Sequence, residues 1–171
     1  YRLPENTKKL RAHIAFAQKK RESGSIAEID LRLEGGVAHI SVDRKKTMQE
    51  LMDAGRYDYV NDNFVKVFPD VEPGAEELDI VFIQFAKAIN NDDILSELDK
   101  MGMRLLSASE LLAVGLTFPD LQWKQGLVGL GSKASVDGGL HVPVLWVRGT
   151  GRTADLVRWD GDWDGHYRFP A

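Results

Sequence analysis

The chain has 171 residues, 43% of them hydrophobic and 28% charged, which suits one compact domain or one domain with an N-terminal extension. It contains no cysteine, which excludes disulfides, a thiolate metal site and a cysteine nucleophile. No stretch approaches the roughly 18 consecutive apolar residues of a membrane-spanning helix. The net charge of −4 argues against a general nucleic-acid-binding protein.

The N-terminal region begins with a predicted basic helix. Thr7 is a suitable N-cap and Gly24 a suitable end for it. Its apolar stripe consists of Leu10, Ile14 and Ala17. Residues 1–25 hold seven basic and two acidic side chains, a balance of about +5 (7 − 2). Such a helix can contact phosphates or an acidic partner, or it can simply present a solvated face.

A β-hairpin and a short helix follow in the sequence. Apolar and polar residues alternate over residues 29–34 and again over residues 38–42, on either side of Gly35-Gly36. This pattern predicts a hairpin with one buried face. Residues 47–50 form a capping-box pattern that opens a short helix, which Gly55 ends.

The predicted boundary between two units lies after these elements. Residues 57–64 are predicted to form a loop, and Pro69 and Pro73-Gly74 mark the expected boundary. We therefore divide the chain into an N-terminal unit, residues 1–75, and a C-terminal domain, residues 76–171. The N-terminal unit could also complete the C-terminal sheet or make an oligomer contact.

The C-terminal domain opens with a predicted strand and two helices. Residues 78–85 are almost continuously apolar, which predicts a buried strand. A helix is predicted from Asp92 or Asp93 to Gly102. A second capping box, at residues 107–110, opens a helix that closes near Phe118-Pro119. The remaining predicted strands are residues 127–130, 140–147, 154–159 and 167–169.

No set of residues has the spacing of a catalytic or metal site. The histidines are His13, His39, His141 and His166. No pair of them has the spacing that metal ligands use, and no G-x-S-x-G motif is present. Asp160, Asp162 and Asp164 alternate like calcium ligands, but no bidentate glutamate follows at the end of such a loop. We therefore expect no catalytic residue, no metal and no cofactor.

Residues 126–132, Gly-Leu-Val-Gly-Leu-Gly-Ser, superficially resemble a phosphate-binding loop. They lack the final Gly-Lys-Ser/Thr, and no predicted helix follows to offer its N-terminus. We interpret these glycines as positions where two backbones approach closely inside a β-rich domain.

All four tryptophans lie at the C-terminal end of the chain, interleaved with glycine, aspartate and arginine. They are Trp123, Trp146, Trp159 and Trp163. Tryptophan, tyrosine and arginine concentrate binding energy at interfaces, because each offers a large contact area for little ordering entropy. A single tryptophan is well explained by the core of a small β-rich domain, whereas the whole segment predicts a displayed recognition surface.

Three short motifs resemble those of formylglycine-generating-type C-type lectin-like domains. Residues 104–111, Arg-Leu-Leu-Ser-Ala-Ser-Glu-Leu, resemble the R-L-P-T-x-x-E-W helix start of that family. Residues 130–132 resemble its G-G-S-W strand, and residues 167–169 resemble its closing G-F-R strand. The departures from the family pattern are Leu106 for Pro, Leu111 for Trp, Lys133 for Trp and His166 for Gly.

This resemblance implies an α+β fold of the C-type lectin-like type. It would have two helices and a β-rich, loop-rich C-terminal half, preceded by the helix and hairpin extension. The redox catalysis of the oxidase members is not expected, because the chain has no cysteine.

The chain is also similar to variable proteins of diversity-generating retroelements, in which a C-type lectin-like fold carries a diversified C-terminal stretch. The scaffold-like positions would be Leu130-Gly131-Ser132, Val142-Pro143, Leu145, Leu156, Trp159, Trp163 and Arg168-Phe169. Between them lie the expected ligand-binding residues, Asp137, His141, Trp146, Arg148, Thr150, Asp155, Arg158, Asp160, Asp162, Asp164 and His166. Residues 57–61 and 109–112 also resemble uncharacterised proteins of that kind.

The expected function is that of a non-enzymatic ligand-binding protein with a hypervariable C-terminal recognition surface. Its ligand is expected to be a protein rather than nucleic acid, and an oligomer is possible. The alternative is a structural or regulatory interaction protein that acts through its basic N-terminal helix. An enzyme using His141 or His166 with a nearby aspartate has no supporting motif. With no visible signal peptide and no cysteine, the expected location is cytoplasmic or not fixed by the sequence.

Overall fold

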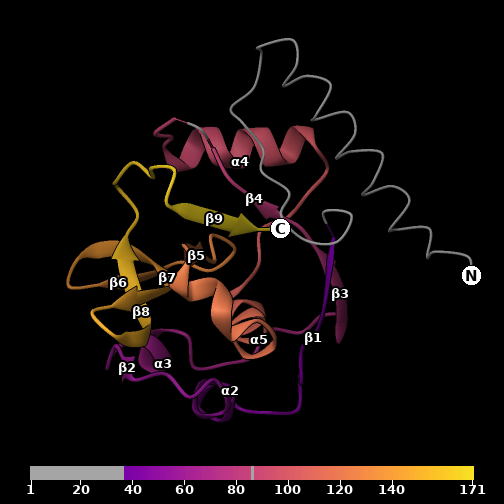
Figure 1. Cartoon of the computed structure of the whole chain (residues 1–171), viewed down its shortest axis with the longest axis vertical. Coiled ribbons are helices and arrows are strands. Elements are labelled where there is room, and N and C mark those ends of the chain that lie inside the picture. Colours follow the sequence, from indigo (N-terminus) through magenta and orange to yellow (C-terminus); the bar gives the residue numbers. More distant parts are fainter. Residues whose placement is uncertain (1–36, 86) are drawn as a thin grey trace, which may run out of the picture.

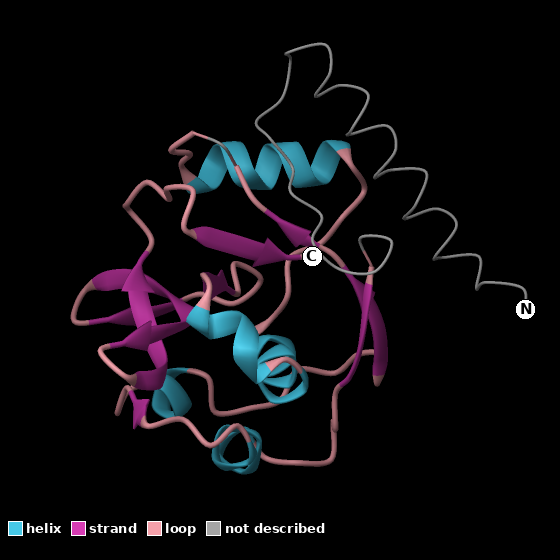
Figure 2. Ribbon diagram, in the orientation of Figure 1, coloured by secondary structure: helices cyan, strands magenta, loops and turns pink. Residues whose placement is uncertain are grey.

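The computed structural model describes residues 37–85 and 87–171, in which helices and strands combine in an α+β fold (Figures 1 and 2). The helices are α2 (Met48–Ala54), α3 (Phe64–Val67), α4 (Asn91–Lys100), α5 (Ala108–Thr117) and a short 3₁₀ helix (Pro119–Trp123). The strands are β1 (Ala38–Ser41), β2 (Tyr59–Val60), β3 (Glu77–Ile80), β4 (Phe82–Ile83), β5 (Gly126–Val128), β6 (Ala134–Val136), β7 (Gly139–Arg148), β8 (Gly151–Arg158) and β9 (Tyr167–Pro170). None of the described helices is long and apolar enough to cross a membrane.

The described strands form one mixed sheet and one separate ribbon. The sheet has the order β2-β8-β7-β5-β9-β4, and β6 pairs with β7 beside this path. Strands β2 and β8 run parallel, as do β5 and β9, and the other pairs are antiparallel. Strands β1 and β3 form the antiparallel ribbon. The longest element is the β7–β8 hairpin, which stays paired from His141 opposite Arg158 to Arg148 opposite Gly151.

The seven-stranded sheet separates two hydrophobic cores. Leu145 of β7 packs in the core that contains residues of α2 and α5. Its neighbour Val144 packs in the other core, with Ile94 of α4 and with Trp163. Figure 1 shows α4 and α5 on opposite sides of the β4–β9 pair. Successive residues of a strand point to opposite faces, and β4, β5, β7 and β8 each contribute to both cores.

Side chains at the N-termini determine where the helices begin. The capping boxes predicted at residues 47–50 and 107–110 are confirmed, because in both the N-cap hydroxyl and the glutamate carboxylate accept backbone N–H groups. For α4 the cap is Asn90, whose side-chain oxygen accepts the N–H of Asp93 at 2.9 Å. This helix therefore begins slightly earlier than the aspartates predict.

The structure changes two predicted elements near the middle of the chain. The predicted strand 78–85 is two strands, because the chain leaves the ribbon at Val81, whose backbone exchanges hydrogen bonds with that of Ala171. The predicted loop 57–64 contains the short strand β2 and the start of α3. Both errors have one cause, since long-range pairing with β8 and with the C-terminus decides these conformations.

The N-terminal predictions are tested only in part. The basic helix and the strand predicted at residues 29–34 lie outside the described residues. Strand β1 shows the predicted alternation, with Ala38 and Ile40 buried and His39 and Ser41 exposed, but its partner in the described part is β3.

Residues on either side of the predicted boundary at residue 75 share one core. Ile40 and Met48 belong to the same hydrophobic cluster as Leu111 of α5. Strand β2 joins the large sheet beside β8, so Tyr59–Val60 completes the C-terminal sheet. The division at residue 75 itself stays a prediction.

The close backbone approach predicted for the glycines of residues 126–132 is confirmed at Gly131. A Cβ atom at this position would lie 2.5 Å from the carbonyl oxygen of Leu105 and 2.6 Å from that of Leu106. The Gly131 N–H also donates to the Leu106 carbonyl at 2.9 Å. The strand-to-strand connection after β5 is therefore pressed directly against the segment that leads into α5.

We expect Gly131→Ala to lower the free energy of unfolding by about 2 kcal/mol or more, because the added methyl group meets backbone that cannot move aside. Chemical denaturation of the purified protein measures this change. The matched control is Gly161→Ala, where a Cβ meets no atom within 4 Å. Equal stability of the two variants would contradict this account of the close approach.

Candidate functional site

The β7–β8 hairpin carries many of the predicted ligand-binding residues and divides them between its two ends. His141 and Arg158 face each other at one end, and Arg148 lies opposite Gly151 at the other. At about 3.3 Å per residue, His141 and Arg148 are roughly 23 Å apart along β7. The hairpin therefore holds two separate groups of predicted residues.

The two groups also lie on opposite faces of the sheet. Residues opposite each other in an antiparallel pair share a face, and the faces alternate along each strand. Trp146 and Arg148 share a face with Val144, whereas His141 shares a face with Leu145. A single compact ligand contact cannot include both groups through this sheet.

The group near the hairpin turn gathers aromatic rings around an arginine. The Arg148 guanidinium carbon lies 5.6 Å from the ring centre of Tyr59 and 5.8 Å from that of Trp146. Tyr59 reaches this position because β2 runs parallel to β8, which places Tyr59 beside Thr153. The Tyr59 side chain is 46% exposed, and Arg148 is exposed.

A buried carboxylate lies behind this arginine. Asp155 is only 6% exposed, and its Oδ1 accepts hydrogen bonds from Asn61 Nδ2 at 2.7 Å and from the Leu156 N–H at 2.8 Å. Its Oδ2 lies 3.5 Å from Arg148 Nη2. These bonds fix the carboxylate, so Asp155 positions Arg148 rather than offering itself to a ligand. We call Tyr59, Asn61, Trp146, Arg148 and Asp155 the turn-end surface.

The tryptophans have different environments. Trp163 is buried, packs against Tyr167 and Phe169, and donates its Nε1–H to Asn91 Oδ1 at 2.8 Å. This agrees with the scaffold position predicted for it. Trp123 is 51% exposed. Trp146 is half-buried, and its covered Nε1–H finds no acceptor in the described part of the chain.

The other end of the hairpin presents a polar group around Arg158. The Arg158 Nη2 lies 3.0 Å from Asp160 Oδ2, and both side chains are exposed. Arg158 holds the pKa of Asp160 below its ordinary value through a hydrogen bond. Asp137 has a φ of +49° between β6 and β7. His141 Nδ1 lies 3.0 Å from the Gly139 carbonyl oxygen.

The remaining predicted residues lie in exposed turns. Thr150 is in the turn between β7 and β8, and Asp162, Asp164 and His166 are in the connection from β8 to β9. Asp164 Oδ1 accepts the His166 N–H at 2.8 Å, and this bond lowers the pKa of Asp164. Within residues 37–85 and 87–171, no group of three histidine, aspartate or glutamate side chains is arranged to hold a metal ion.

Arg152 is a second arginine at the hairpin turn, and it has a different role from Arg148. Its guanidinium donates to the carbonyl oxygens of Gly55 and Gly115, at 2.6 and 2.8 Å, and to Gln122 Oε1 at 2.8 Å. Its Cζ also lies 4.8 Å from the ring centre of Tyr57. Arg152 thus ties the hairpin to the ends of α2 and α5.

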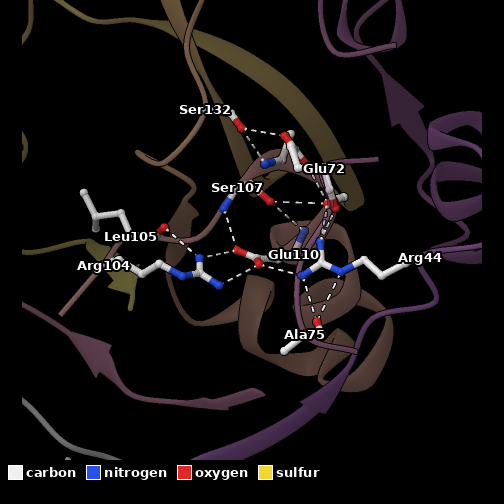
Figure 3. A network of polar contacts seen from close by, with 10 residues as sticks. Arg44, Glu72, Ala75, Arg104, Leu105, Ser107, Glu110 and Ser132 are labelled. Carbon is white, nitrogen blue, oxygen red and sulfur yellow. Dashed lines mark hydrogen bonds and ion pairs between the residues drawn. The ribbon is translucent and has the colours of Figure 1, made fainter. Parts of the chain in front are cut away.

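A buried carboxylate organises the start of α5, and Figure 3 shows it between two arginines. Glu110 Oε1 accepts from Arg44 Nη2 and Arg104 Nη2, both at 2.8 Å. Its Oε2 accepts from Arg104 Nη1 at 2.7 Å and from the Ser107 N–H at 2.9 Å. Burial opposes ionisation, but the bonds from Arg104, Ser107 and Arg44 lower the pKa of Glu110 to about 2.

The same network extends to the segment before β3. Arg44 also donates to the carbonyl oxygens of Glu72 and Ala75, at 2.9 and 3.0 Å. The Glu72 carboxylate accepts from the hydroxyl of Ser109 at 2.6 Å. It also accepts from the hydroxyl of Ser132 at 3.0 Å (Figure 3). A Glu110 carboxylate with a pKa of about 2 is a poor general base, so we interpret this cluster as a structural tie between chain segments.

The turn-end surface includes two residues that the sequence analysis did not select, Tyr59 and Asn61. Both come from the predicted loop 57–64, and a parallel strand pairing brings them to the hairpin. The sequence offered the aromatic and polar pattern of residues 57–61 and their resemblance to uncharacterised retroelement-type proteins, but neither indicates a pairing partner.

No protein-family model, no curated protein and no solved structure matches this chain.

We expect Glu110→Gln to lower the free energy of unfolding by about 3 kcal/mol near neutral pH, because it leaves the nearly buried Arg44 without its charged partner. The folded pKa of Glu110, about 2, lies below its ordinary value of 4.5. Its ionisation therefore stabilises the fold above pH 4.5, and this contribution is lost as the pH falls from 4.5 towards 2.

The stability difference between wild type and Glu110→Gln should accordingly shrink over that range, as measured by denaturation at a series of pH values. The matched control is Glu50→Gln, in the solvent-exposed capping box of α2, which should change stability much less. A constant difference between wild type and Glu110→Gln from neutral pH down to pH 2 would refute the assignment.

The two arginines at the hairpin turn provide a second matched pair. We expect Arg152→Gln to lower the free energy of unfolding by about 3 kcal/mol, because it removes charge-assisted bonds to partly buried carbonyl groups. We expect Arg148→Gln to stay within about 0.5 kcal/mol of wild type, because that side chain is exposed. Thermal and chemical unfolding of both variants make the comparison. If Arg148→Gln lowered the free energy of unfolding as much as Arg152→Gln does, Arg148 would be a residue that stabilises the fold and not one displayed for binding.

Proposed function

We propose that this chain is a non-enzymatic ligand-binding protein that recognises its target through the turn-end surface. The observation that carries the proposal is the exposed Arg148 guanidinium next to the rings of Tyr59 and Trp146. Arginine, tyrosine and tryptophan are the residue types that dominate binding energy at protein interfaces. A protein is therefore the expected ligand, as the composition of the C-terminal segment also suggests.

The rigidity of the hairpin supports this role. Strand β7 pairs with β8 from His141 to Arg148, and Arg152 binds the turn end to the carbonyl groups of Gly55 and Gly115. A side chain displayed on such an element loses little further freedom on binding. A few anchors of this kind supply the roughly 8–12 kcal/mol that correspond to micromolar to nanomolar affinity.

We further propose that the exposed C-terminal positions are diversified, as in the variable proteins of retroelements, on a C-type lectin-like fold. The α+β arrangement, with α4 and α5 followed by a β-rich C-terminal half, is consistent with that fold. The exposed predicted residues are interleaved with buried scaffold residues such as Val142, Leu145 and Trp163. Surface changes of this kind usually alter stability by no more than about 0.5 kcal/mol.

The alternative function, an interaction through the basic N-terminal helix, rests on residues outside the described part of the chain. Alanine substitutions at Trp146 and Arg148 distinguish the two. If the turn-end surface is the recognition site, these substitutions should abolish ligand binding while the protein still folds. If the N-terminal helix is the site, ligand binding should be unaffected.

Sequencing this locus across a natural population of its host tests the diversification. We expect substitutions at the exposed positions, at adenine-templated codons of a nearby near-repeat of the coding sequence. These positions are Asp137, Arg148, Thr150, Arg158, Asp160, Asp162, Asp164 and His166. We expect no variation at buried Val144, Leu145, Trp163 and Phe169. A uniform sequence, or variation spread evenly along the chain, would exclude the retroelement relationship and leave a binding protein with a fixed surface.

A further inference from the structure

We infer that the turn-end surface binds a carboxylate-bearing peptide segment of a partner protein, with Arg148 as the residue that holds the carboxylate. This inference rests on the proposed function and names the chemistry of its ligand. It depends on what Arg148 contacts, on the charges around it, and on the aromatic side chains beside it.

The Arg148 guanidinium has N–H groups that can donate hydrogen bonds to a ligand. It is 64% exposed, and its one ion-pair contact among the described residues is Asp155 Oδ2 at 3.5 Å. That distance exceeds the roughly 2.7–2.9 Å of a charge-assisted hydrogen bond. The guanidinium fork matches the two oxygens of a carboxylate, so a carboxylate approaching from solvent can form the paired bonds that Asp155 does not form.

Among anions, the surrounding charges oppose a singly charged group less than a doubly charged one. Asp155 lies beside the guanidinium, and the Asp58 side chain lies next to Gly151, the residue opposite Arg148 in the hairpin. Two nearby carboxylates oppose a doubly charged phosphate more strongly than a carboxylate. The net charge of −4 on the chain further disfavours a polyanion such as nucleic acid.

The aromatic rings beside Arg148 indicate which kind of ligand side chain lies next to the bound carboxylate. Tyr59 is 46% exposed, Trp146 is half-buried, and their ring centres lie 5.6 and 5.8 Å from the Arg148 guanidinium carbon, so an apolar or aromatic side chain of the ligand has a surface to cover. The expected motif is therefore an acidic residue next to an aromatic or large apolar one.

Selection from a displayed library of short random peptides against the full-length protein tests this inference. Peptides selected by the wild-type protein should be enriched in aspartate or glutamate beside an aromatic or apolar residue. A selected acidic peptide should bind Arg148→Gln at least about tenfold more weakly, because a charge-assisted paired bond is lost. Replacing the acidic residue of that peptide by its amide should have a similar effect on wild type and little effect on Arg148→Gln.

Lys100→Gln is the control, because it removes an exposed cation from α4, where its ion-pair partner is Glu97 of the same helix. It should leave the selected peptides and their affinities unchanged. Selected peptides without acidic enrichment, or equal losses of affinity in Arg148→Gln and Lys100→Gln, would overturn the inference.

Two further variants separate this result from the proposed function. If Tyr59→Ala and Trp146→Phe change which peptides are selected although acidic residues are not enriched, the recognition surface stands and only the carboxylate chemistry is wrong. If neither of these variants nor Arg148→Gln affects selection, the proposed function fails together with the inference.

Discussion

The carboxylate of Glu110 joins chain segments that are far apart in the sequence, and the position of α5 depends on it. It accepts the N–H of Ser107 at the start of the helix and pairs with Arg44 and Arg104 from two other segments. Taking a carboxylate out of water is unfavourable unless its oxygens are fully bonded, and the two guanidinium groups and the N–H meet that requirement. The helix held in this way presents Leu111 to the core beneath the sheet, and the β7–β8 hairpin rests on that core.

The hairpin has one face that attaches it to the rest of the fold and one that it can display at its turn. Leu145 and Arg152 lie on the first face, in contact with the core and with backbone carbonyl groups of α2 and α5. Trp146 and Arg148 lie on the second, where the partner is Tyr59 from the edge strand. Because the strand alternates between the two faces, a substitution at Arg148 changes what the surface presents without touching the contacts that position it.

Local signals in the sequence were sufficient for the starts of α2 and α5 and for most of the C-terminal strands. The capping boxes at residues 47–50 and 107–110 are such signals, because each involves side chains three residues apart. The different roles of Arg148 and Arg152 were also within reach, since a two-residue turn at Gly149-Thr150 places them on opposite faces. The position of Tyr59 could not be predicted from the sequence. Any short apolar run could pair with β8, and only tertiary packing selects Tyr59–Val60 for that place.

Asp155 limits how freely the turn-end surface can change. It lies on the same face as Arg148 but is buried, and it accepts bonds from Asn61 and from the Leu156 N–H. Replacing it would leave those donors without their acceptor, at about 1–3 kcal/mol for each buried one, and would also release Arg148 from its position. A diversifying process that acted equally on every interleaved position would therefore weaken the fold at Asp155 while changing only recognition at Arg148 and Thr150. Sequence variation that is compatible with folding is therefore expected at the exposed turn of the hairpin and in the connection from β8 to β9. Asp155, the buried carboxylate, is expected to stay constant.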